Sequence, residues 1–63
     1  MNQSALNAFM ARKIQIDAAM AKLMAASEDH FDVMPEDVNW AHVGDLGRIA
    51  ELMDEAAKIA SGS

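Results

Sequence analysis

The sequence predicts an all-α fold: a single helical domain over residues 1–63, with a long N-terminal helix, a short middle helix and a C-terminal helix. Residues 5–28 contain neither Pro nor Gly and are rich in residues that favour helix. Apolar residues recur there and in residues 46–60 at the spacing of an amphipathic helix. The chain has 63 residues and no cysteine, so good helix packing or oligomerisation must stabilise it in place of disulfides.

The first helix is expected to run from Ala5 to about Glu28, with the Ser4 hydroxyl as its N-terminal cap. Its apolar side chains cover close to half of the circumference, which is wide for a helix that packs against one short partner. They form a stripe and its flank, which consist of Leu6, Phe9, Ile16, Met20 and Leu23, and of Met10, Ile14 and Met24.

Lys13 and Asp17 lie four residues apart within this apolar arc, and two interpretations are open. The pair can be an ion pair at the edge of the apolar face, worth about a few tenths of a kcal/mol. Alternatively, the two residues divide two apolar stripes, one facing the chain's own core and one facing another chain. Polar residues within a helical seam can also set the register of a pairing.

A turn is expected at residues 27–33, because this stretch is polar and poor in helix formers towards its end. Pro35 then opens the middle helix, which we expect to run to about His42, since Pro fits the first position of a helix. As an alternative, Asn39 caps a separate turn that carries Trp40.

The C-terminal helix is expected from Leu46 to about Ala60. Gly44 is expected to end the preceding helix in the left-handed conformation, and Asp45 to cap the new one. Residues 61–63, Ser-Gly-Ser, predict a helix stop followed by a frayed tail. The expected apolar face consists of Leu46, Ile49, Leu52, Met53, Ala56, Ala57, Ile59 and Ala60, with Glu51, Asp54, Glu55 and Lys58 largely opposite.

Trp40 is the single tryptophan of the chain. We expect it to be a core residue that closes the middle helix over the other two, since a small protein needs its apolar area inside. The alternative is an anchor in an interface with another protein, where tryptophan is enriched.

The formal net charge is −5, and it is unevenly distributed. Residues 1–27 contain three basic residues and one carboxylate, a net of +2, whereas residues 28–63 contain two basic residues and nine carboxylates, a net of −7. A nucleic-acid interface needs a basic face, so we do not expect nucleic acid as a partner. The acidic half either folds against the basic half or presents a face to a basic partner.

No pattern in the chain predicts catalysis, a cofactor or a metal site. Glu28, Asp29, His30 and Asp32 form an acidic run, but they lack the spacing of a calcium loop and the ligand set of a zinc site. The serines lie at helix ends or in the tail, without an oriented base beside them, and no phosphate-binding glycine loop is present. We therefore expect a protein without enzymatic activity.

A membrane span is not expected, because no stretch approaches the length of about 18 apolar residues that crosses a bilayer. The first four residues lack the basic start of a signal peptide. These observations predict a cytoplasmic protein with no membrane partner.

Residues 30–46 read HFDVMPEDVNWAHVGDL. This segment resembles a motif, roughly HFxVxPEDVNWxHVG followed by a helix, in small uncharacterised proteins of bacteriophages and mobile elements. The resemblance implies a phage or plasmid setting in a bacterial host cell, and nothing catalytic. Small acidic phage proteins often bind and block host proteins, which by analogy of size and charge suggests such a role.

We therefore expect a protein–protein interaction module, such as a phage-encoded binder or inhibitor of a host protein. The alternatives are an accessory factor associated with nucleic acid and a structural subunit of a phage assembly. We also expect a homodimer through the first helix, because its apolar half-circumference is too long for the shorter helices to cover. The candidate interface consists of Leu6, Phe9, Met10, Lys13, Ile14 and Asp17.

Overall fold

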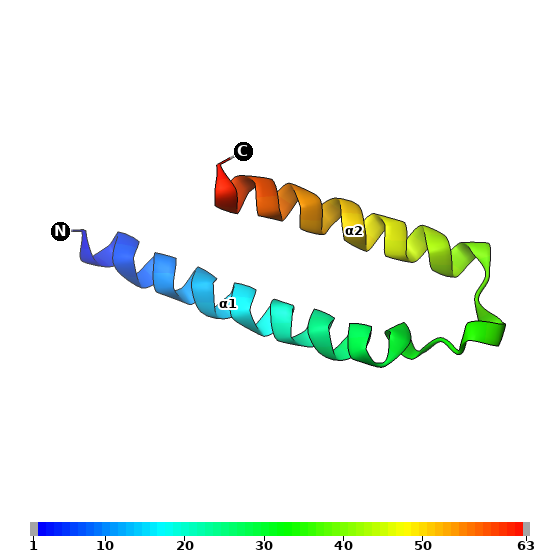
Figure 1. The fold of residues 1–63 in the computed structure, drawn as a ribbon. Helices are drawn as coiled ribbons and strands as arrows, with labels where there is room; N and C mark the ends of the chain where they lie inside the picture. The colour runs from blue at the N-terminus through cyan, green and yellow to red at the C-terminus, as the bar shows by residue number, and fades with distance from the viewer. Residues whose placement is uncertain (1, 63) are drawn as a thin grey trace. The chain divides into compact units, whose positions relative to one another are not determined.

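A computed structural model describes residues 2–62, and every regular element in that range is helical (Figure 1). The predicted all-α order of a long N-terminal, a short middle and a C-terminal helix is confirmed. The elements are α1 (Gln3–Glu28), η1 (His30–Asp32), η2 (Pro35–Asp37) and α2 (Trp40–Ser61). The chain divides into two units, residues 1–33 and residues 34–63, so its organisation as a single domain stays a prediction. The frayed tail expected at Ser63 lies outside the described residues.

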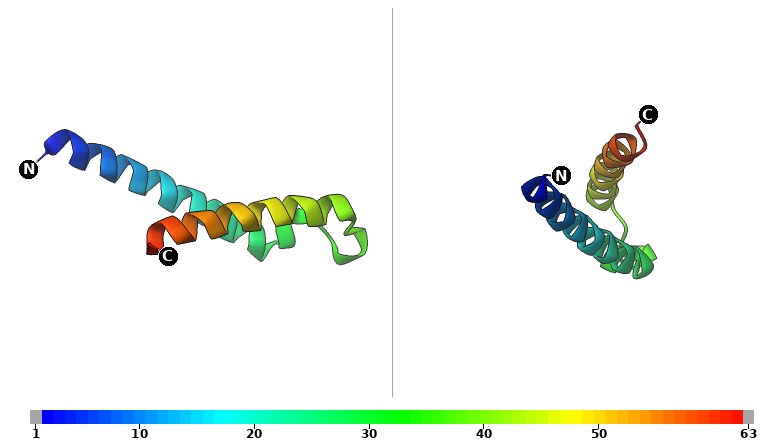
Figure 2. Two further views of the ribbon diagram at one scale, coloured as in Figure 1. Left: turned by 90° about the horizontal axis from the view of Figure 1, so that it is seen from above. Right: turned by 90° about the vertical axis from the view of Figure 1, so that its left-hand side faces the viewer.

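Helix α1 starts two residues earlier than predicted, and its cap is Asn2 rather than Ser4. The backbone of Asn2 is extended, and its Oδ1 accepts a hydrogen bond of 2.9 Å from the Ala5 amide. Asn is among the strongest N-cap residues, so it satisfies an amide that would otherwise have no partner. Ser4 lies inside the first turn instead. The helix then continues without interruption to Glu28, as the two views of Figure 2 show.

The turn predicted after α1 is confirmed, and it is left-handed. His30, Phe31 and Asp32 have φ angles of 54°, 54° and 59°, a region that costs non-glycine residues roughly 1–2 kcal/mol each. Two backbone hydrogen bonds hold the turn, from Asp32 N to Asp29 O (3.0 Å) and from Val33 N to His30 O (3.1 Å). Element η1 contacts α1, and the half-buried residues of this unit are Leu23, Ala26, Phe31 and Val33. Apolar burial in this unit therefore offsets part of the backbone strain.

Helix α2 starts at Trp40, six residues before the predicted start of the C-terminal helix. The middle helix is only the single 3-10 turn η2, after which Val38 and Asn39 are extended. Asn39 Oδ1 accepts from His42 N (3.1 Å), and His42 Nδ1 accepts from Asn39 N (3.2 Å). This reciprocal pair is a capping box, with His42 in the role that Glu or Gln usually has. The alternative prediction of an Asn39 cap is thus confirmed, although Asn39 caps the whole C-terminal helix.

The predictions that Gly44 ends a helix and that Asp45 caps the next one are wrong. Both residues lie inside α2, and Gly44 is not in the left-handed region. The capping box starts the helix upstream of them, and a helix that has already started continues through a glycine at a cost of about 1 kcal/mol. The helix stop predicted at Gly62 is confirmed: its φ is 73°, and its amide donates to Lys58 O at 2.9 Å.

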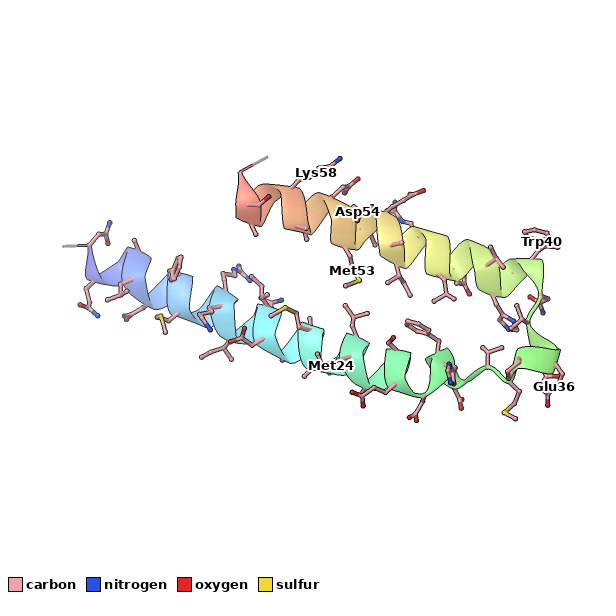
Figure 3. The ribbon with its side chains drawn as sticks, in the orientation of Figure 1. Met24, Glu36, Trp40, Met53, Asp54 and Lys58 are labelled. Carbon is pink, nitrogen blue, oxygen red and sulfur yellow. The ribbon has the colours of Figure 1, made fainter. Side chains whose placement is uncertain are left out.

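The prediction that Trp40 is a core residue is wrong for this chain, since 86% of its surface is exposed. Its place on α2 explains the exposure. Trp40 and Lys58 are 18 residues apart, which is five full turns at 3.6 residues per turn, so both lie on the polar face. Figure 3 shows Trp40 and Lys58 projecting from α2 away from the side on which Met53 projects. An interface role for Trp40 stays a prediction.

Replacing His30 by Gly is expected to raise the free energy of unfolding by about 1 kcal/mol, because Gly adopts a positive φ without a steric penalty. The matched control is His30→Val, which should lower it, since a β-branched residue is disfavoured in this region. Urea unfolding followed by far-UV circular dichroism at one chain concentration measures both. Equal stability of the two variants would contradict the left-handed turn.

Removing the cap with Asn39→Ala is expected to lower the free energy of unfolding by about 1 kcal/mol and to reduce helicity. Asn39→Asp is the control, because its carboxylate can still accept from the amide of His42. The same urea experiment separates the two variants. An Asn39→Ala protein as stable as Asn39→Asp would mean that the helix starts elsewhere.

Trp40→Ala is expected to change the free energy of unfolding by less than about 0.5 kcal/mol, since an exposed side chain loses little packing. The fluorescence emission of the unmodified chain should match that of an indole in water. A loss of about 3 kcal/mol, which is typical of a buried tryptophan, together with blue-shifted emission would show that Trp40 is buried in solution.

Candidate protein interface on helix α1

The described side chains include no fully buried residue, and most large apolar ones are exposed. On α1, Phe9 and Ile14 expose 67% and 66% of their surface. A soluble monomer rarely presents a contiguous apolar patch of such length, and a patch of this kind usually marks an interaction surface. The geometry of α1 shows how its apolar side chains are arranged.

One row of α1 side chains follows alternating spacings of three and four residues, which keeps it on one helix face. It extends over about 26 Å at 1.5 Å per residue. Its first, second and fifth members expose 41%, 67% and 54% of their surface, and its last member is half-buried. We call it the central row, and it consists of Leu6, Phe9, Lys13, Ile16, Met20 and Leu23.

A second row lies beside the central row on the same helix and has the same kind of spacing. Its large apolar members are exposed as well. We call it the flanking row, and it consists of Met10, Ile14, Asp17, Ala21 and Met24. Each row is therefore apolar along its length except for one charged residue, which is Lys13 in the central row and Asp17 in the flanking row.

These two charged residues form an ion pair, which is one of the two interpretations that the sequence left open. Lys13 Nζ lies 2.8 Å from Asp17 Oδ2, and the two side chains are 58% and 51% exposed. At such exposure the pair stabilises the helix by only about 0.3–0.5 kcal/mol. For the candidate interface, the position of this ion pair is more informative than its energy. The pair links the central row to the flanking row near the middle of α1.

All six candidate residues of the sequence prediction are thus on α1, and the structure divides them between the rows. Leu6, Phe9 and Lys13 belong to the central row, and Met10, Ile14 and Asp17 belong to the flanking row. The candidate set omitted Ile16, Met20 and Leu23, which complete the central row. The alternating spacing is the signal in the sequence that identifies them.

Helix α2 has an apolar face of smaller side chains. Three alanines occupy its C-terminal part, whereas Leu46 and Met53 are exposed and Ile49 is half-buried. Its polar face carries Trp40 and an ion pair between Arg48 and Glu51, with 3.7 Å between Nη1 and Oε2. Because α1 carries the larger apolar side chains over the greater length, α1 is the stronger candidate interface.

The described residues offer neither a metal site nor a membrane-spanning helix. Within residues 2–62, no group of three or more His, Asp or Glu side chains is arranged to hold a metal ion. Neither α1 nor α2 combines the length and the hydrophobicity that a helix needs to cross a membrane.

Comparison of the chain with known protein families, with curated protein sequences and with solved structures finds no match.

Proposed function

We propose that this chain is a non-enzymatic protein–protein interaction module, and that its first partner is a second copy of itself, bound through the central row of α1. The observation that carries the proposal is the exposure of most large apolar side chains of α1, from Leu6 to Met24. Burying such surface contributes roughly 25 cal/mol per Å². A two-fold dimer is the commonest closed solution for such a face.

A second partner is proposed for the surface that the dimer leaves open. The flanking row stays beside the paired central rows, and its large apolar side chains are exposed in the chain. The resemblance of residues 30–46 to proteins of phages and mobile elements supports a host protein of a bacterial cell as this partner. The net charge of −5 favours a basic surface on it, through long-range attraction.

Light scattering coupled to size exclusion tests the self-association. At micromolar concentration the mass is expected to be twice the chain mass of 6.8 kDa. Phe9→Glu should return the protein to a monomer or unfold it, because it places a carboxylate in the central row, where burial without a partner is costly.

Ala18→Glu is the matched control for this experiment. It adds the same charge to the same helix, but position 18 lies opposite the central row, at 100° per residue. This variant should stay dimeric. A folded monomer of the unmodified chain, or equal effects of the two variants, would contradict the proposal.

A further inference from the structure

The central row of α1 has a symmetry that bears on how two copies pair. Its spacings are three, four, three, four and three residues, so the pattern of spacings, though not of residue types, is the same from either end of the helix. When two copies of α1 run in opposite directions with their central rows aligned, a residue lies opposite the partner residue whose number brings the sum to 29. Leu6 then meets Leu23, Phe9 meets Met20, and Lys13 meets Ile16, without a gap or a shift of register.

The charge in the row distinguishes the two directions. In a parallel pair each Lys13 meets the partner's Lys13, and two like charges in an apolar seam repel each other. In an antiparallel pair Lys13 lies opposite the partner's Ile16, and the partner's Asp17 follows one residue later. Each Lys13 can then pair with Asp17 of its own chain, as it does at 2.8 Å, and with Asp17 of the partner.

The ends of α1 favour the same direction. Helices usually carry acidic residues in the first turn and basic ones in the last, in accord with the helix dipole. Helix α1 has neither, and instead ends with Glu28 followed by Asp29. An antiparallel pair sets these carboxylates beside the positive N-terminal end of the other helix. A parallel pair would set them beside two more carboxylates.

We infer that the chain forms an antiparallel homodimer in which the two central rows interlock and the two Lys13–Asp17 pairs join at the dyad. This inference rests on the proposed function, since it specifies how the proposed dimer is built. It assigns Lys13 and Asp17 a role in setting direction and register, one of the two interpretations that the sequence left open.

Disulfide trapping tests the direction, because the chain has no cysteine of its own. Chains carrying Phe9→Cys and Met20→Cys are mixed, equilibrated and oxidised with glutathione, and the linked species are separated by mass. In the antiparallel dimer, position 9 of one chain is adjacent to position 20 of the other. The two copies of position 9 are about 16 Å apart along the helix at 1.5 Å per residue, beyond the reach of about 7 Å between Cα atoms of a disulfide.

The mixed 9–20 dimer is expected to exceed each same-position dimer at least tenfold. A second mixture, Leu6→Cys with Leu23→Cys, should give the same preference, and it keeps the test valid if one cysteine variant fails to fold. Predominant same-position dimers would show a parallel pairing, and a statistical mixture would show no defined direction. Either result overturns the inference.

The two proposals can fail separately. If light scattering gives a dimer while the trapping gives same-position links, only the antiparallel arrangement is wrong. If light scattering gives a monomer, the dimer itself is wrong, and the antiparallel arrangement is overturned with it.

Discussion

The exposed apolar face of α1 is the feature on which the rest of this structure depends. Ordering a residue into a helix costs roughly 1–2 kcal/mol of backbone entropy, and a domain normally recovers this by burying apolar side chains. Here no described residue is fully buried. The helices have their backbone hydrogen bonds and their caps, but these contribute little net free energy in water. The proposed burial of the apolar face of α1 against a second chain adds such a contribution and links folding to association.

Local interactions decide where each helix begins and ends. Asn2 and Asn39 accept hydrogen bonds from first-turn amides, and Gly62 ends α2 in the left-handed conformation. The end of α1 is different, because the left-handed turn is made by three residues with side chains. Phe31 in this turn is half-buried, as is Leu23 of α1. A glycine at position 31 would relieve the strain but would lose the aromatic side chain, so the two effects oppose each other.

A lysine and an aspartate inside an apolar arc lower the attraction between two helices but raise its specificity. A uniformly apolar row would pair in either direction and in several registers. Each row contains one charged residue, and the two form an ion pair of 2.8 Å. These charges give the possible directions and registers of pairing different free energies. The free energy of the exposed ion pair is small. Its effect on the preferred direction of pairing grows when water is removed from around the two charges. This effect supports the proposed role of the ion pair in setting the direction of pairing.

The sequence by itself determined the all-α class, the extent of α1 to within two residues, and a helix stop within residues 61–63. These features follow from composition, from the absence of Pro and Gly in residues 5–28, from the glycine in the Ser-Gly-Ser segment, and from the three- and four-residue periodicity of a helix. The six candidate residues on α1 were found in the same way, since they share one helix face.

Only the structure decided where α2 begins and on which face Trp40 lies, and it did so through local hydrogen bonds. Asn39, Gly44 and Asp45 each satisfy a local rule for a helix boundary, so the sequence offered competing starts. The outcome depends on the sum of interactions along the helix, and the reciprocal bonds between Asn39 and His42 favour the earliest start. Because α2 is one continuous helix from Trp40 onward, the helical periodicity fixes the face on which each of its residues lies. It places Trp40 on the polar face with Lys58, where a short-range pattern in the sequence could not have located it.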